Sequence, residues 1–349
     1  MTPCLQPDLV MSERAIVDLR SDTFTRPNAE MYRAMADAPV GDDVYGEDET
    51  VNLLEATAAN LLDKEAALFV SSATQANLIA MMTHCRRGEE VISGDRYHVI
   101  VAEAGGASTL GGVVMQPLPT DANGGLSLAQ VLDAIKPDDP HCPISRLLSL
   151  ENTVSGMVQN PDQHREMVKA VHEQGLVSHL DGARLMNASI ALGRSAADIV
   201  APFDSVMLCL SKGLGAPVGA MLCGEAEFIE RARRLRKQLG GGMRQAGILA
   251  ACGLYALEHN IKRLAEDHSR AAQLAEGIGN LEELRASHHT NMVFIDPPAD
   301  RYQALENHLQ ENGVLVGRFE SPTRLVTHLD IDDGQIERTI DVFRSFYRH

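Results

Sequence analysis

Short apolar runs alternate with amphipathic stretches through the middle of the chain, which predicts strands alternating with helices. The runs LLSL and VMLCL contain almost no polar residues, as expected for parallel strands that are covered on both faces. The pattern therefore predicts an α/β domain around a mainly parallel sheet of seven strands. The predicted strands cover residues 66–71, 90–93, 113–117, 147–150, 176–180, 206–210 and 218–223, and the helices between them cover 74–86, 126–135, 164–174 and 226–237.

The pattern changes after Met243. Two long helical stretches, 243–259 and 261–276, precede strand-like NMVFID, a helical stretch over 302–312, strand-like VLVGRF and RLVTHL, and a last helix from about Gly334. This order predicts a smaller α+β domain. The first sixty residues, which include APVGDDVYGEDET, predict an irregular segment that is either a solvated loop or an arm over a neighbouring subunit. We therefore divide the chain into an N-terminal segment (1–60), a large domain (61–260) and a small C-terminal domain (261–349).

The chain is acidic, with 31 Lys and Arg against 48 Asp and Glu and a formal net charge of -17 over 349 residues. This balance argues against a nucleic acid or an anionic membrane as partner, although a few local donors could still hold a small anion. Because the chain shows neither a membrane-length apolar run nor a signal peptide, we expect a cytoplasmic protein with no membrane partner. The six cysteines are scattered without a Cys-x-x-Cys pair, so we expect no metal site and no disulfide framework.

One candidate for chemistry is Lys212 in SKGLG, directly after the apolar run VMLCL. Open α/β sheets bind their ligands at the carboxyl ends of the strands. Partial burial there would favour the neutral amine that a Schiff base requires. The alternative is a lysine that merely extends from a strand end into solvent.

Two further candidates also follow predicted strands. Asp181 in LDGAR lies one strand–helix–strand unit before Lys212, and its carboxylate could pair with a protonated ring nitrogen or cap the next helix. The run SSATQAN opens a helix, whose free N–H groups suit a phosphate, although an ordinary Ser/Thr cap is the alternative. Arg244 follows a triple glycine, GGGMRQ, which cannot be a stable helix interior, and is free to hold an anion.

A strand-end lysine, a strand-end aspartate and a phosphate-binding helix start together describe a site for pyridoxal 5'-phosphate (PLP). The lysine would bond to the cofactor, the aspartate would keep the pyridine nitrogen protonated, and the helix start would hold the phosphate. The chain also resembles the low-specificity L-threonine aldolases, which are PLP-dependent enzymes of fold type I. The resemblance is carried, in order from residue 19 to 330, by LRSDTFTRP, DDVYG, SSATQANL, LLSLENT, LDGAR, SKGLG, GGGMRQ and RLVTHLD.

The resemblance implies roles for individual residues. At the cofactor, the resemblance implies that Lys212, next to Ser211, bonds to PLP, that Asp181 faces the pyridine nitrogen and that Arg184 lies at O3′. It also implies that the phosphate is held by Ser72, Ala73 and Thr74, and that His98 lies against the ring face. Those implied at the substrate are Ser21 and Arg324 at the carboxylate, Arg184 beside them, and His141 near the hydroxyl; Tyr45 and Arg244 would reach the site from, or across, a subunit interface. The chain departs from the family pattern at Ala73, where a glycine is usual, and at Val154, where a histidine often follows ENT.

The implied activity is cleavage of L-threonine or L-allo-threonine, and of related β-hydroxy-α-amino acids, to glycine and an aldehyde. The implied assembly is a homotetramer made of two dimers. A β-eliminating lyase or an amino-acid racemase on the same fold is the alternative enzyme, because both would use Lys212 and Asp181. A cofactor-free α/β binding protein is the alternative from another class.

Overall fold

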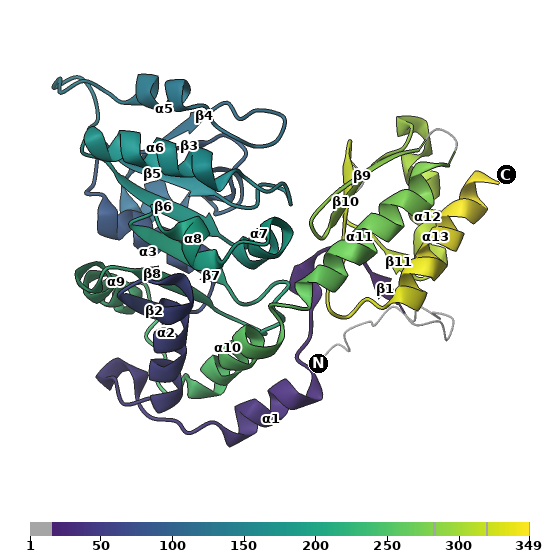
Figure 1. Cartoon of the computed structure of the whole chain (residues 1–349), viewed down its shortest axis with the longest axis horizontal. Coiled ribbons are helices and arrows are strands. Elements are labelled where there is room, and N and C mark those ends of the chain that lie inside the picture. Colours follow the sequence, from purple (N-terminus) through teal and green to yellow (C-terminus); the bar gives the residue numbers. More distant parts are fainter. Residues whose placement is uncertain (1–15, 282–283, 319, 349) are drawn as a thin grey trace, which may run out of the picture.

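A computed structural model describes residues 16–281, 284–318 and 320–348 of the chain. It shows a large α/β domain and a smaller domain that carries the end of the described chain, joined along α10 and α11 (Figure 1).

The large domain is built on a seven-stranded sheet in the order β2-β8-β7-β6-β5-β3-β4. β8 runs antiparallel to both of its neighbours, and every other pair is parallel. This confirms the predicted fold class and all seven predicted strands. The strands are β2 Ala66–Val70, β3 Glu90–Gly94, β4 Val114–Leu118, β5 Ser145–Glu151, β6 Val177–Gly182, β7 Ser205–Cys209 and β8 Ala220–Gly224.

Helices cover both faces of this sheet, so its central strands are apolar on both sides. In β7, Met207 and Cys209 pack toward α3 and α9, whereas Val206 and Leu208 belong to the main core on the other face. The helices of this domain and of the connection out of it are α3 Ala73–His84, α4 His98–Val101, α5 Leu128–Ala134, α6 Pro161–Glu173, α7 Leu185–Leu192, α8 Ala196–Val200, α9 Ala226–Gln238 and α10 Gly247–His259.

The expectation of an irregular N-terminal segment is wrong for the part that the structure describes. Helices α1 (Ala29–Asp37) and α2 (Glu49–Leu62) occupy much of it, and Asn28 and Asp48 cap their first turns. α2 buries Leu54, Ala58 and Leu62 in the main core, because these residues recur along one helix face. The segment is therefore largely part of the large domain's packing.

The small domain has an antiparallel sheet in the order β12-β10-β9, packed against long helices. Its elements are α11 Leu264–Gly279, β9 Arg285–His289, β10 Met292–Asp296, α12 Tyr302–Glu311, β11 Val314–Leu315, β12 Thr323–Val326 and α13 Asp333–Tyr347. Among the described residues of VLVGRF, only β11 is a strand. It pairs in parallel with β1 (Val17–Asp18) near the start of the described chain. Val17 and Leu19 thereby join the small-domain core.

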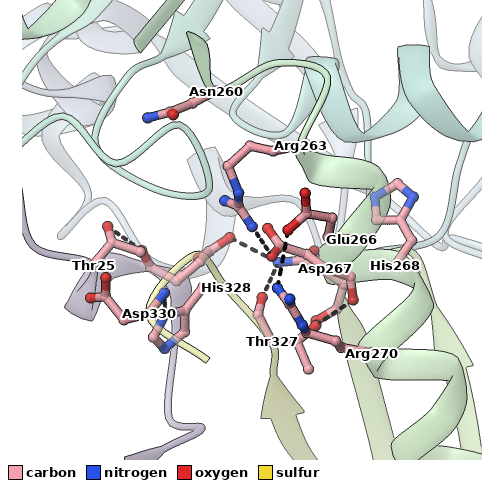
Figure 2. A network of polar contacts seen from close by, with 12 residues as sticks. Thr25, Asn260, Arg263, Glu266, Asp267, His268, Arg270, Thr327, His328 and Asp330 are labelled. Carbon is pink, nitrogen blue, oxygen red and sulfur yellow. Dashed lines mark hydrogen bonds and ion pairs between the residues drawn. The ribbon is translucent and has the colours of Figure 1, made fainter. Parts of the chain in front are cut away.

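A polar network at the start of α11 joins the two domains (Figure 2). Asn260 Nδ2 donates to the carbonyl of Leu214 at 2.7 Å, and Thr25 Oγ1 donates to the carbonyl of Lys212 at 3.1 Å. Arg263 pairs with the buried Asp267, whose backbone carbonyl accepts from Thr327 Oγ1 at 2.7 Å. The loop that follows β7 is therefore held by the end of α10 and by the N-terminal segment.

No helix in the described part of the chain is long and apolar enough to cross a membrane.

The loop after β7 has little room for extra atoms. Gly215 has a φ of 78°, and an added Cβ would lie 2.4 Å from Leu329 Cδ2, whereas Gly193, with a φ of 62°, has nothing within 4 Å. Alanine strains the backbone at both positions, but only at Gly215 does it also clash. We expect Gly215→Ala to lower the free energy of unfolding by about 1 kcal/mol more than the matched Gly193→Ala does, because the end of the half-buried Leu329 side chain must move. Urea denaturation followed by circular dichroism checks this, and equal losses would contradict it.

Candidate active site

The carboxyl ends of β2, β5, β6 and β7 lie at one edge of the sheet, because these strands all run in the same direction. Asp181, near the end of β6, is the register partner of Glu151 at the end of β5. The Lys212 loop follows β7, and the start of α3 follows β2. The topology therefore brings the predicted lysine, aspartate and helix start to the same edge.

Asp181 is a buried hydrogen-bond acceptor. One carboxylate oxygen accepts from the backbone N–H of Ala183 at 3.0 Å, and the other accepts from Asn77 Nδ2 at 2.7 Å. The N-cap of α7 is Arg184, so the alternative role of Asp181 as a helix cap does not apply. A buried carboxylate at this position suits a protonated ring nitrogen.

The start of α3 offers free donors. Ser72 Oγ accepts from the backbone N–H of Gln75 at 3.1 Å, and the N–H groups of Ala73 and Thr74 donate to no atom of the described residues. Ala73 does not have a positive φ, so its methyl group is tolerated there. These free N–H groups, together with Lys212 and the buried Asp181, match the phosphate, aldehyde carbon and pyridine nitrogen of PLP, and the residues present fit the cofactor.

Arg184 is held by a carboxylate that the sequence did not single out. Its Nε and Nη2 donate to the two oxygens of Asp22 at 2.8 and 2.6 Å, and Asn291 Nδ2 donates to Asp22 at 3.2 Å. Burial acts to raise the pKa of Asp22, but the charge and hydrogen bonds of Arg184 lower it to about 2. Two of the Arg184 donor nitrogens are therefore already used within the protein.

Arg324 and Ser21 lie toward the small domain. Ser21 directly precedes Asp22, and its Oγ accepts from the backbone N–H of Thr23 at 3.2 Å. Arg324 lines a cavity of about 620 Å³ between the domains, in which five arginines face only two carboxylates. Burial and the nearby Arg184 lower the pKa of Arg324, which forms no ion pair with a described residue. This cavity suits an anionic group. Its arginines are Arg20, Arg96, Arg285, Arg318 and Arg324.

His98 opens α4 at the same edge. Its backbone N–H donates to Glu151 Oε2 at 2.6 Å, and its Nδ1 lies 2.8 Å from Glu103 Oε1. Ligand-type atoms of His98, Glu103 and Asp181 all lie within 4.8 Å of one another. Burial and the Asp181 charge raise the pKa of Glu151. The sequence did not single out Glu103 or Glu151, although Glu151 lies in the ENT motif.

The structure does not bring His141 to this group within one chain. Its side chain is 90% exposed and hydrogen-bonded to Asp139 in the loop before β5, whereas the site lies at the other end of that strand. Val154 is buried, so it adds no polar contact where the family often has a histidine.

Tyr45 and Arg244 lie together, but on the surface. Arg244 pairs with Asp42 at 2.9 Å, and the Tyr45 side chain is 76% exposed. The glycine run lets its loop approach the start of α3, since an added Cβ on Gly241 would lie 2.5 Å from Gln75 Nε2.

Comparisons with known proteins agree with this geometry. The family model of the beta-eliminating lyases matches residues 18–299. The low specificity L-threonine aldolase of Escherichia coli strain K12 is 47% identical over 332 residues, which cover 95% of this chain and 99% of that protein. The threonine aldolase structure from Leishmania major superposes with a TM-score of 0.82 at 24% identity, covering 95% and 99% of the two chains. A structure of SPT with PLP superposes with a TM-score of 0.72 at 17% identity, covering 95% and 87%.

The chain belongs to the beta-eliminating lyase family, and its fold is that of the fold type I PLP-dependent enzymes. Within that class its sequence places it with the low-specificity L-threonine aldolases.

The ion pair between Asp22 and Arg184 generates a prediction about pH. The folded-state pKa of Asp22, about 2, lies below its ordinary value of 3.8, so the stabilisation is complete above about pH 4 and is lost as the pH falls toward 2. Between pH 6 and pH 3 we expect the wild type to lose about 1 kcal/mol of this stabilisation, and Asp22→Asn to lack this part of the pH dependence. Asp22→Asn should also be less stable at pH 6 by about 3–5 kcal/mol, because Arg184 is left buried without its partner.

Urea denaturation at pH 6 and pH 3 measures both effects. The control is Asp198→Asn, which breaks the surface pair of Asp198 with Arg194 and should leave the pH dependence almost unchanged. An Asp22→Asn variant with the same pH dependence as the wild type would rule out this role of the pair.

Proposed function

We propose that this protein cleaves L-threonine, L-allo-threonine and related β-hydroxy-α-amino acids to glycine and an aldehyde, with PLP as cofactor. The observation that carries the proposal is the convergence of Lys212, the buried Asp181 and the free N–H groups of α3 at one sheet edge, beside a cavity rich in arginine. The 47% identity to the Escherichia coli enzyme supports threonine as the substrate.

We assign the following roles to the residues of the site. The Lys212 amine and the start of α3 hold the cofactor, and Asp181 keeps its ring nitrogen protonated. When bound, PLP supplies an acceptor for the electrons of the Cα–Cβ bond. Arg324 and Ser21 hold the substrate carboxylate and so set which bond at Cα faces that acceptor. His98, at the same edge, takes the proton from the β-hydroxyl.

A β-eliminating lyase or a racemase would use Lys212 and Asp181 in the same way, and the family name includes the first of these activities. These enzymes differ in the bond that they break at Cα. Their products separate them: aldol cleavage gives glycine and acetaldehyde, β-elimination gives a keto acid, and racemisation gives the D-amino acid.

Product analysis therefore tests the proposal. We expect wild-type protein with PLP and L-threonine to release equal amounts of glycine and acetaldehyde. Lys212→Ala should lose the visible absorption of covalently bound cofactor, which borohydride bleaches in the wild type, and nearly all cleavage. A colourless wild type would support a cofactor-free binding protein, and a keto acid or D-threonine as main product would support the alternative enzymes.

We further propose that the active protein is a homotetramer of two dimers that share their active sites. Exposed apolar side chains gather on the N-terminal segment and α10, where a second copy could cover them: Tyr32, Val40, Val44, Tyr45, Leu53 and Ile248. A second copy would also be needed to bring Tyr45, Arg244 or His141 to a site. The cytoplasmic location expected from the sequence stays a prediction.

Complementation between inactive variants tests the shared site. Mixing Lys212→Ala with Arg244→Ala and reassembling the subunits should restore up to about a quarter of the wild-type activity, since half of the random dimers would carry one intact site. Light scattering should report a tetramer. A fully active monomer, or no recovery in verified hybrids, would place Arg244 in the site of its own chain or outside any site.

A further inference from the structure

A continuous chain of buried hydrogen bonds runs from His98 into the large domain. Glu103 Oε1 lies 2.8 Å from His98 Nδ1 and accepts from Asn77 Nδ2 at 2.8 Å. The same Asn77 nitrogen donates to Asp181 at 2.7 Å. Asn77 thus bridges the carboxylate beside His98 and the carboxylate assigned to the cofactor ring.

The donors and acceptors in this series of hydrogen bonds can be assigned in only one way. Asn77 uses its two N–H bonds on the carboxylates, so its Oδ1 must accept, and the His179 Nε2 that lies 3.1 Å away must donate. Burial lowers the pKa of His179 to about 4, so its ring is neutral and its Nδ1 accepts from Ser205 Oγ at 2.8 Å. The donors of Ser205, His179 and Asn77 therefore follow one another in a single direction, which ends at the carboxylates of Glu103 and Asp181.

Glu103 is buried where its neighbours are not. Val101, Ala102, Ala104 and Gly105 are exposed, whereas the Glu103 side chain is only 6% exposed. Directly after it the backbone turns through positive φ angles, 53° at Ala104 and 65° at Gly105. A positive φ at an alanine is strained, so the fold maintains an unfavourable turn beside an inward-pointing carboxylate.

We propose that Glu103 is a positioning residue for His98. An ionised carboxylate only accepts hydrogen bonds, so it holds the proton on Nδ1 and leaves Nε2 as the acceptor that removes the β-hydroxyl proton. The His98 Nε2 forms no hydrogen bond with a described residue. Asn77 fixes the carboxylate relative to Asp181, and therefore fixes the imidazole relative to the cofactor ring. This inference rests on the proposed function.

Glu103→Met tests the inference, because methionine keeps roughly the size of the side chain but offers Nδ1–H no strong acceptor. Glutamine would not do so, since Asn77 Nδ2 must face its carbonyl oxygen, which would still accept from Nδ1–H. We expect kcat for L-threonine cleavage to fall about 10²-fold, the scale of a lost general base, with KM changed less than about 3-fold. Exchange of the glycine α-hydrogen with deuterium needs no β-hydroxyl base and should stay within about 3-fold of the wild type. The matched control is Glu65→Met, which alters a surface glutamate that accepts from the Ala226 N–H and should change neither rate.

A double-mutant cycle separates positioning from structural support. In a His98→Phe background, which keeps a ring but no acceptor, Glu103→Met should cause no further loss of cleavage. An additional loss as large as in the wild type would overturn the proposal, as would equal losses of cleavage and glycine exchange in Glu103→Met.

A further measurement needs neither cofactor nor turnover. In cofactor-free protein labelled with ¹⁵N-histidine, the His98 signals are those that disappear in His98→Phe. They should report Nδ1–H in the wild type and mainly Nε2–H in Glu103→Met. A wild-type ring already protonated on Nε2 would overturn the proposal. If the wild type releases no glycine from threonine, the proposed function fails, and these NMR signals still decide whether Glu103 sets the tautomer.

Discussion

The buried pair of Asp22 and Arg184 is the interaction on which the arrangement of the site depends. Arg184 comes from the large domain, Asp22 from the N-terminal segment, and Asn291, which donates to Asp22, from the small domain. Removing one member of a buried pair leaves the other charge without compensation. The interaction therefore fixes the positions of the large domain, the N-terminal segment and the small domain relative to one another. Ser21 and Thr25 flank Asp22, and Thr25 contacts the Lys212 loop.

The distribution of charge follows from this arrangement. The protein as a whole is strongly acidic, yet arginines outnumber carboxylates five to two in the lining of its cavity between the domains. The carboxylates at the sheet edge are either paired, as Asp22 is, or bound by amide and imidazole donors, as Asp181 and Glu103 are. Local donors thus create a place for an anion in a protein whose net charge is also negative.

Much of the fold and the centre of the site could be predicted from the sequence. Lys212, Asp181 and the start of α3 follow apolar runs directly, and parallel strands bring such positions to one edge. α2 was missed because the acidic, turn-rich residues before it obscured the spacing of Leu54, Ala58 and Leu62. Glu103 and Asp22 could not be found, since each acts through a partner that only tertiary packing supplies. His141 does not lie at the candidate site of its own chain, because it precedes β5 and the site is at the other end of that strand. A sequence motif does not indicate at which end of a strand it will lie.

The pairing of β1 with β11 joins residues almost three hundred positions apart, at opposite ends of the described chain. The small domain is therefore discontinuous in sequence, and the large domain is inserted within it. Closing so long a loop is slow compared with forming local helices. During synthesis the large sheet can form first, but the strand pair must wait until its second member has left the ribosome. Asn291 and Arg324 arrive equally late, so the end of the site proposed to hold the cofactor can be built well before the end proposed to hold the substrate carboxylate.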